Sequence, residues 1–355
     1  MNQFWSPALN SLDPYIPGEQ PTVPNMIKLN TNENPYPPSP AALEAIRQAS
    51  DTSLRLYPDP ESKALRQTIA GLNSLSFEQV FVGNGSDEVL ALLFFALLKH
   101  DLPILFPDIT YSFYPVYCSL HGIDYRLIPL DDGFRINVSD YCQDNGGIIL
   151  ANPNAPTGIG LGFDEIRHLL QNNRESVVVI DEAYIDFGGQ SAIPLIEEFA
   201  NLVVVQTLSK SRALAGLRVG YAMAQPSLIM ALNIVKGCFN SYPLDRLAQI
   251  GAMEALLDQD YFESTRQKVM KSRDWLTVEL RQRDFIVLPS QANFLFVKPV
   301  NCEAAKMHVL LREQNILVRH FAKPRIEGFL RITIGTQQEC KLLLEAIDAL
   351  VLSTR

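Results

Sequence analysis

Apolar residues along the middle of the chain are grouped in blocks whose spacing predicts strands and helices in alternation. Four blocks are nearly continuous in Val, Ile and Leu, as is typical of parallel strands buried on both faces: "QVFVGNG" (79–85), "GIILANP" (147–153), "SVVVIDEAY" (176–184) and "NLVVVQTLS" (201–209). Segments with helical spacing, such as "AALEAIRQAS" and "SKALRQTIAGLN", precede the first of them. This alternation predicts a doubly wound α/β fold with a mostly parallel sheet.

A further apolar block, "VLALLFFALL" from Val89, has the length of a buried helix. We expect this helix to cover "SDEVLALLFFALLKH", with Ser86 as its N-cap, because a hydroxyl there can accept a hydrogen bond from the first turn. No apolar run in the sequence is long enough to span a bilayer, so no membrane span is expected.

The two ends of the chain have a different pattern from the middle. Up to residue 40 the sequence is rich in Pro and Asn, which excludes regular helix and predicts an extended arm with a short strand at "IKLN". A long helical stretch (245–283) precedes three strand-like segments, "NFLFVKP", "ILVRHF" and "GFLRITIG". We therefore predict an arm (1–40) that packs with a smaller α+β domain (276–355), and a large domain (41–275) between them.

Composition and charge narrow the classes of function. The 355 residues suit two domains, and the hydrophobic share of 47% is ample for a large core. The net charge of -9 argues against a nucleic-acid-binding protein, which needs a basic face. The five cysteines show no metal-binding spacing, and the first residues lack the features of a secretory signal. We therefore expect free thiols in a reducing cytoplasm, and no bound metal.

Polar residues gather where the predicted strands end, which is where open α/β sheets bind their ligands. Taken singly, each has an ordinary explanation, such as a tight turn, a helix cap, an ion pair or a solvated lysine. Their position at successive strand ends favours one shared site. These groups are the glycine turn 83–87, the amide-rich loop 152–158, the pair Asp181 and Tyr184, and the set Thr207, Ser209, Lys210 and Arg218.

Pyridoxal phosphate is the cofactor whose chemistry needs this combination. Its aldehyde needs a lysine amine, its ring nitrogen a carboxylate, and its phenolic oxygen a hydrogen-bond donor; Lys210, Asp181 and Tyr184 are expected in these roles. Lys210 is also the expected general base for the substrate's α-proton. The phosphate needs N–H groups at a helix N-terminus, hydroxyls and an arginine. The residues expected there are Gly85, Ser86, Asp87, Thr207, Ser209 and Arg218.

Beyond these residues, the sequence resembles the fold-type-I pyridoxal-phosphate aminotransferases, and more narrowly the histidinol-phosphate aminotransferases. The motifs that carry the resemblance follow the family's order over nearly the whole chain: "KLNTNENPYPPSP", "LYPDP", "VGNGSDE", "NPNAPTG", "VVIDEAYIDF", "TLSKSRALAGLRVGY" and "GFLRITIGT". The resemblance implies transamination between L-histidinol phosphate and 2-oxoglutarate in histidine biosynthesis, giving imidazole-acetol phosphate and L-glutamate.

The resemblance also implies further cofactor contacts and a homodimer. Tyr111, in "DITYSFY", matches the aromatic residue that stacks on the cofactor ring, and Tyr57, in "LYPDP", matches a tyrosine that reaches the phosphate in the neighbouring subunit. One position departs from the pattern. Many aminotransferases have asparagine directly before "PTG", where this chain has Ala155. Either Asn154, one residue earlier, binds the phenolic oxygen, or Tyr184 serves alone.

For the substrate, the resemblance points to the arm and the small domain. Arg331, in "FLRITIG", matches the arginine that binds the carboxylate of glutamate, a task that suits the two parallel donors of a guanidinium. Arg319 and Tyr15 resemble groups that hold the phosphate of histidinol phosphate, and Asn32, in "NTNENP", is also expected among the substrate-binding residues.

Three alternatives remain open at this stage. The chain could be an aromatic amino-acid aminotransferase or a threonine-phosphate decarboxylase, since a few site residues decide which bond to the α-carbon breaks. It could also be a non-catalytic ligand-binding module of a transcription regulator, although the acidic charge and the Pro-rich arm argue against that. A nicotinamide-dependent dehydrogenase would explain the sheet but would leave Lys210 and Asp181 without a role.

Overall fold

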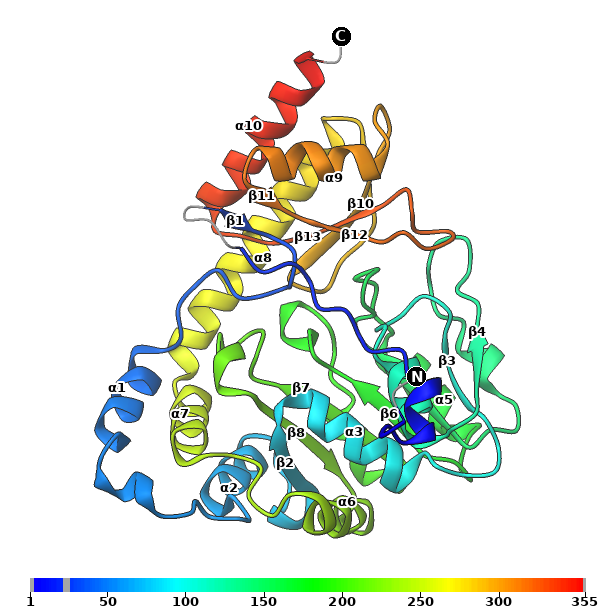
Figure 1. Cartoon of the computed structure of the whole chain (residues 1–355), viewed down its shortest axis with the longest axis vertical. Coiled ribbons are helices and arrows are strands. Elements are labelled where there is room, and N and C mark those ends of the chain that lie inside the picture. Colours follow the sequence, from blue (N-terminus) through cyan, green and yellow to red (C-terminus); the bar gives the residue numbers. More distant parts are fainter. Residues whose placement is uncertain (1–2, 22–25, 354–355) are drawn as a thin grey trace.

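A seven-stranded sheet forms the centre of the larger part of the molecule (Figure 1). The computed structural model describes residues 3–21 and 26–353. The strands have the order β2-β8-β7-β6-β5-β3-β4; β3 to β7 run parallel, and β8 is antiparallel to both of its neighbours. This confirms the predicted mostly parallel α/β fold. The strands are β2 (Val80–Asn84), β3 (Ile104–Pro107), β4 (Tyr125–Ile128), β5 (Gly147–Ala151), β6 (Val178–Asp181), β7 (Leu202–Thr207) and β8 (Val219–Ala224).

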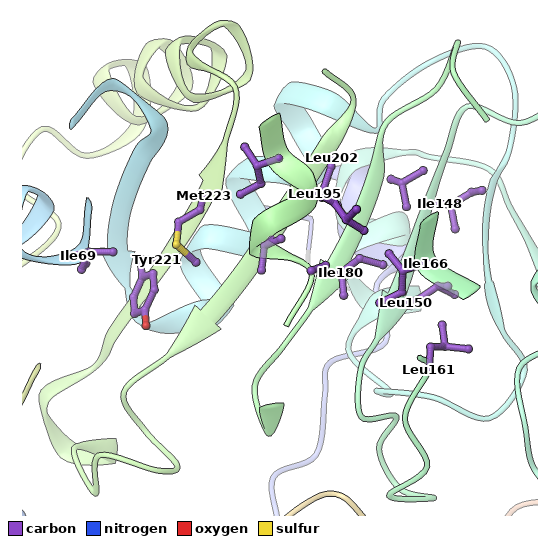
Figure 2. Close-up of a cluster of buried hydrophobic side chains, with 14 of the residues drawn as sticks. Ile69, Ile148, Leu150, Leu161, Ile166, Ile180, Leu195, Leu202, Tyr221 and Met223 are labelled. Carbon is purple, nitrogen blue, oxygen red and sulfur yellow. The ribbon is translucent and has the colours of Figure 1, made fainter. Parts of the chain in front are cut away.

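Apolar side chains cover both faces of this sheet, which explains the near-continuous Val and Ile runs in the sequence. Ile148, Leu150 and Ile180 point to one face, where Figure 2 shows them in the same buried cluster as Met223. Alternate residues of the same strands point to the other face. Three helices cover the first face: α2 (Lys63–Leu72), α5 (Phe163–Gln171) and α7 (Arg246–Leu257). Three others cover the second face: α3 (Gly85–Leu97), α4 (Tyr114–His121) and α6 (Pro226–Phe239).

Helix α3 begins two residues earlier than the predicted N-cap implied. Asn84 occupies the N-cap and Gly85 is the first helical residue, so the prediction that Ser86 is the N-cap is wrong. Ser86 instead lies in the first turn of the helix. A hydroxyl and a backbone N–H at that position are both free to face a ligand beyond the sheet.

A smaller antiparallel sheet of order β12-β13-β10-β9 carries the C-terminal part of the chain. Strand β1 (Ile27–Lys28) of the arm pairs in parallel with β11 (Ile316–Leu317), and these two strands form a separate two-stranded sheet. The arm therefore packs on the small domain. The remaining elements here are β9 (Phe285–Val287), β10 (Phe294–Pro299), β12 (Arg319–His320), β13 (Leu330–Thr333), α9 (Ala304–Glu313) and α10 (Gln337–Ser353).

The long helical stretch predicted between the two domains is divided into α7 and α8 (Gln259–Arg281) at Asp258, whose side chain caps α8 by accepting from the Tyr261 N–H at 3.3 Å. Figure 1 shows α8 running from the large sheet to the small one. The boundary predicted at residue 275 falls inside α8, and its exact position stays a prediction. Helix α1 (Pro40–Ala49) packs on α7.

Two sequence-based expectations concern the molecule as a whole. The cysteines are free thiols, as predicted. None of the helices within residues 3–21 and 26–353 combines the length and the apolar character that a bilayer crossing requires.

Candidate active site

A cavity of about 710 Å³ lies between the large sheet, the small domain and the arm. Most residues predicted for the site line it, and Gly85, Asn154 and Tyr57 are the predicted residues that do not. We distinguish two groups of lining residues. The cofactor side comprises Ser86, Asp87, Asp181, Thr207, Ser209, Lys210 and Arg218. The substrate side comprises Tyr15, Asn32, Arg319 and Arg331, and Tyr111 and Tyr184 lie in the same lining.

Lys210 follows the end of β7 and directs its amine into the cavity. Its Nζ donates to the backbone oxygen of Thr31 at 3.3 Å and lies 5.8 Å from the centre of the Tyr184 ring. Asn34 holds the backbone from the other side, because its Nδ2 donates to the carbonyl oxygens of Lys210 and Ser211 at 3.1 and 3.0 Å. The arm thus fixes both the backbone and the amine of this lysine.

Asp181 is the last residue of β6 and is only 5% exposed. Its Oδ2 accepts a hydrogen bond from Tyr114 Oη at 2.9 Å, whereas its buried Oδ1 has no partner among the described residues. Burial raises the pKa of this carboxyl to about 6, against the Tyr114 hydrogen bond, which lowers it. Since a buried carboxylate oxygen without a donor is costly, a ligand that offers an N–H here would be stabilised.

The first turn of α3 lies at one end of the cavity and carries groups that suit an anion. Ser86 brings a hydroxyl and a helix N-terminal N–H group, and Thr207 Oγ1 and Ser209 Oγ lie 3.0 Å apart at the end of β7. Arg218 Nη2 donates to Asp87 Oδ2 at 2.7 Å, and both side chains are partly exposed. Hydroxyls, a guanidinium and a helix N-terminus together suit a phosphate group.

Two glycines allow the segments around this anion site to approach closely. Gly85 has a φ of +78°, and a Cβ there would lie 2.4 Å from Arg218 Nη2. Gly220, on β8, faces the first turn of α3, where a Cβ would lie 2.2 Å from the backbone nitrogen of Ser86. Gly85 therefore contributes by leaving room for the arginine, although it does not line the cavity itself.

Aromatic rings form one wall of the cavity. Tyr111 donates through its hydroxyl to Asp87 Oδ1 at 3.1 Å, and its ring meets that of Tyr114 nearly at right angles, with centres 5.6 Å apart. Burial raises the pKa of Tyr111 well above its ordinary value, so its hydroxyl stays protonated. Tyr15, from the arm, packs on Phe113 with ring centres 4.8 Å apart. The arm thereby closes this wall.

Tyr184 presents its hydroxyl to the cavity, and Asn154 does not. Tyr184 Oη accepts a hydrogen bond from Asn32 Nδ2 at 3.0 Å. The Asn154 amide is already bonded within the protein: Nδ2 donates to the Ile109 oxygen, in the segment after β3, at 2.9 Å and to Thr157 Oγ1, in its own loop, at 3.2 Å. Of the two possibilities that the sequence left open for the phenolic oxygen, this geometry favours Tyr184 serving without Asn154.

Arg319 and Arg331 are directly opposite each other on the antiparallel strands β12 and β13, and both line the cavity. Arg331 Nη2 donates to the backbone oxygen of Asn30 at 2.9 Å, and its buried Nε has no partner among the described residues. Burial, with a smaller contribution from the neighbouring Arg319 charge, lowers the pKa of Arg331. Two adjacent guanidinium groups in a cavity wall favour an anionic ligand.

Tyr57 lies away from the cavity and is 79% exposed. Its ring stacks on Tyr242, with centres 4.6 Å apart. Its ring partner, Tyr242, is likewise not among the residues that line the cavity.

Several residues of the site were not singled out from the sequence. Tyr114 holds Asp181, and Asn34 holds the backbone of Lys210. Arg325, in the loop between β12 and β13, donates to Asp108 Oδ2 at 2.7 Å and so joins the small domain to the large one beside the cavity. Tyr114 occurs in the quoted motif "DITYSFY", whereas Arg325 lies outside the quoted motifs. The roles of both residues follow only from partners far along the chain.

The cavity fits the pyridoxal phosphate that the sequence led us to expect. The unpartnered Asp181 Oδ1 is placed to accept the proton of a ring nitrogen, and the Lys210 amine is placed for an aldehyde. Ser86, Ser209 and Arg218 line the same cavity, and their hydroxyls and guanidinium are groups that could hold its phosphate. Among the described residues there is no cluster of His, Cys, Asp and Glu that could hold a metal ion.

Comparison with known proteins defines the class. Residues 24–347 match the model of the family "Aminotransferase class I and II". The chain is 57% identical to histidinol-phosphate aminotransferase 1 of Methylococcus capsulatus, over 99% of this chain and 98% of that protein. It is 58% identical to histidinol-phosphate aminotransferase 2 of Rhizobium meliloti, over 98% and 99% of the two chains. The chain therefore belongs to the class I and class II aminotransferases.

Within this family, both of these relatives are histidinol-phosphate aminotransferases, which confirms the resemblance found in the sequence. The fold is also that of the histidinol-phosphate aminotransferase from Sinorhizobium meliloti, solved in complex with pyridoxal-5'-phosphate. That structure superposes with a TM-score of 0.90 at 24% identity, covering 100% of this chain and 99% of the other.

Proposed function

We propose that the protein is a pyridoxal-phosphate-dependent aminotransferase that acts on L-histidinol phosphate and 2-oxoglutarate, giving imidazole-acetol phosphate and L-glutamate. One observation carries the proposal: a lysine amine (Lys210) and a buried carboxylate oxygen that lacks a donor (Asp181 Oδ1) share one cavity with an anion site. The names of the similar relatives support the choice of substrate and a role in histidine biosynthesis.

Each cofactor-side residue has a separate task. When bound, pyridoxal phosphate supplies an electron sink for the negative charge that develops at the substrate's α-carbon. Asp181 accepts the ring N–H and keeps the ring positively charged. The Lys210 amine, once free of the cofactor aldehyde, would take the proton from the substrate's α-carbon and return it to the cofactor. Ser86, Ser209 and Arg218 hold the phosphate and fix the position of the ring.

The substrate side accounts for two donors of different shape. Arg331 binds the α-carboxylate of glutamate through parallel N–H donors. Arg319 lies opposite it and, with Tyr15 from the arm, binds the phosphate ester of histidinol phosphate. The two adjacent guanidinium groups can bind either the carboxylate of glutamate or the phosphate of histidinol phosphate, one at a time. The same wall of the cavity can therefore accept either amino donor.

We further propose that the protein acts as a homodimer in which Tyr57 reaches the phosphate in the partner's cavity. Tyr57 and Tyr242 stack on each other and are both exposed, and Leu54, Leu56 and Phe239, which lie within three residues of them in the sequence, are exposed as well. Exposed large apolar residues of this kind suit an interface. Mixing Tyr57→Ala with Lys210→Ala subunits should regenerate heterodimers with one intact site. Mixtures that exchange subunits and stay inactive would argue that each site is built from a single chain.

The cytoplasm is the compartment that we propose for this enzyme. The cysteines are free, and Cys142 and Cys238 are exposed, where an oxidising environment would favour disulfides between molecules. Cell fractionation with antibody detection tests this directly.

A panel of amino donors tests the proposed activity. With pyridoxal phosphate and 2-oxoglutarate present, L-histidinol phosphate should give glutamate with a higher kcat/KM than phenylalanine, tyrosine or phosphothreonine. Faster turnover of the aromatic amino acids would assign the protein to another aminotransferase of the family. Release of carbon dioxide from phosphothreonine would assign it to the decarboxylases.

A further inference from the structure

Asn32 is a buried residue of the arm whose backbone is fixed by the small domain. It is 1% exposed, and its φ of +56° lies in the left-handed region, which asparagine tolerates better than most residues. Its N–H donates to Thr333 Oγ1 at 2.9 Å, and its oxygen accepts from Asn293 Nδ2 at 3.0 Å. Two side chains of the small domain thus hold this single residue in place.

The side-chain amide of Asn32 connects Thr333 to Tyr184. Thr333 Oγ1 donates to Oδ1 at 3.1 Å, and Nδ2 donates to Tyr184 Oη at 3.0 Å. Because the Thr333 oxygen already accepts the backbone N–H of Asn32, its own proton is available for an acceptor. The oxygen end of the amide therefore faces Thr333, and the NH₂ end faces Tyr184.

The direction of this hydrogen bond decides what Tyr184 can donate. Since Tyr184 Oη accepts from Asn32, its own proton is not used in that contact and is available on the cavity side. An O–H group whose oxygen accepts an N–H is also a stronger donor, because the two bonds polarise each other. Ala155, which packs in the same apolar cluster as Tyr184, carries only a methyl group and cannot share this task.

We infer that Asn32 is a positioning residue: it directs the Tyr184 O–H toward the phenolic oxygen of the bound cofactor and links that direction to the small domain through Thr333. The inference rests on the proposed function, since it requires pyridoxal phosphate in the cavity. Asn32 acts through Tyr184, so its role differs from that of a residue that only binds substrate.

The absorbance of the bound cofactor reports on this arrangement. The bond between Lys210 and the cofactor carries a proton that is shared with the phenolic oxygen, and protonation changes the colour. A hydrogen bond from Tyr184 withdraws charge from that oxygen, so losing it should raise the pH at which the colour changes. The other groups that face Tyr184, namely Lys210, Tyr111 and Arg331, stay the same in the variants that test Asn32.

The first test removes the Asn32 amide or its support. Asn32→Gly tolerates the positive φ and should raise the midpoint of the colour change by roughly 0.5 to 1 pH unit, the equivalent of one hydrogen bond. Thr333→Val should raise it by less. Thr265→Val is the matched control, because this buried threonine of α8 bonds only within its helix, and its midpoint should not move.

The inference would be overturned if both Asn32→Gly and Thr333→Val lowered the thermal stability but left the midpoint of the colour change unmoved. Asn32 would then have only a structural role. The Thr333→Val variant keeps the test decisive if the glycine variant folds poorly, because it leaves the arm sequence intact.

A second test reverses the hydrogen bond. Asn32→Asp has the same shape, but a carboxylate can only accept, so it draws the Tyr184 proton away from the cofactor. The midpoint should rise further than in Asn32→Gly. Because a new negative charge could itself raise the midpoint, the same change is made in Tyr184→Phe, where we expect no further shift. Equal shifts in both backgrounds would mean that charge alone acts, and the inference would be wrong.

The outcome for the unchanged protein separates this inference from the proposed function. If the wild-type protein develops no absorbance band with pyridoxal phosphate, both are overturned. If the band forms normally and the midpoints of the variants do not move, only the role of Asn32 is overturned.

Discussion

The cofactor side and the substrate side of the cavity draw their residues from very different distances along the chain. The cofactor side consists of the ends of strands in one sheet and the turns that follow them. The substrate side joins the arm to the small domain, and its hydrogen bonds connect residues 301 positions apart, such as Arg331 with Asn30 and Thr333 with Asn32.

This difference indicates how each side responds to disturbance. A site built on adjacent strands inherits the rigidity of the sheet. A site that joins two distant segments exists only when both are docked, so its geometry depends on the arm as much as on the arginines. We therefore expect cofactor binding to survive changes in the small domain that alter substrate recognition.

The largest effect should come from Lys210→Ala, which breaks the cofactor side at its reactive group. Turnover should fall by several orders of magnitude, because the covalent bond and the base are lost together, while the phosphate site still binds the cofactor. Lys271→Ala, an exposed position on α8, is the control and should behave as wild type. Borohydride reduction of the wild-type protein followed by peptide mapping should label Lys210, and a label on another lysine would contradict the assignment.

Asp181→Asn should have the next largest effect, because it keeps the shape of the cofactor side and removes its charge. Losing a charge-assisted bond in a buried site should weaken cofactor binding by about ten- to a hundredfold. Turnover should fall further, since an uncharged ring is a poorer electron sink. Tyr114→Phe, which removes only the bond to Oδ2, should cost less. Near-normal turnover in Asp181→Asn would mean that another acid holds the ring nitrogen.

The substrate side should respond selectively. We expect Arg319→Ala to lower kcat/KM for histidinol phosphate by about ten- to a hundredfold and to affect the glutamate half-reaction less. Arg331→Ala should damage both half-reactions, and neither change should alter cofactor affinity. Single-turnover measurements with each donor separate these effects. Equal losses with both donors in Arg319→Ala, or none with either, would remove it from substrate recognition and favour an aromatic aminotransferase.

The smallest effect concerns Glu182, a buried carboxyl next to Asp181 beneath the cofactor side. Burial raises its pKa to about 7, although it accepts hydrogen bonds from the Ala192 N–H, Ser191 and Gln206, which lower it. A raised pKa means that the folded state holds the proton more tightly, so this group's contribution to stability falls as pH rises from the ordinary value of 4.5 to about 7.

Glu182→Gln removes that titration, so the melting temperature of the variant should fall less steeply over this pH range than that of the wild type. Parallel slopes for the two proteins would show that Glu182 does not titrate there.

The sequence could predict the cofactor side of the cavity better than the substrate side. Asp181 and Lys210 could be found because local apolar runs identify the strands, and the ends of parallel strands meet at one edge of a sheet. The contact between Asn32 and Tyr184 could not be found in this way, because no local pattern says how the arm lies on the small domain. Asn154 was a candidate only by its place in a motif, and its neighbours Ile109 and Thr157 use its amide instead.

Local signals also misplaced some boundaries. Ser86 is a good N-cap residue, but the left-handed turn at Gly85 starts the helix earlier. The break between α7 and α8 depends on Asp258 acting as a cap, which a continuous helical pattern hides. Both cases involve a single residue whose effect depends on its exact geometry, and hydrophobic spacing does not contain that information.

Gly220 carries no functional group, yet we expect it to tolerate almost no substitution. Even alanine would place a carbon 2.2 Å from the Ser86 nitrogen and 2.5 Å from the carbonyl carbon of Gly85, displacing the first turn of α3. In a survey of all substitutions, Gly220 should therefore be as intolerant as the reactive lysine. No inhibitor or labelling reagent would reveal this position, because glycine presents no side chain that could bind or react.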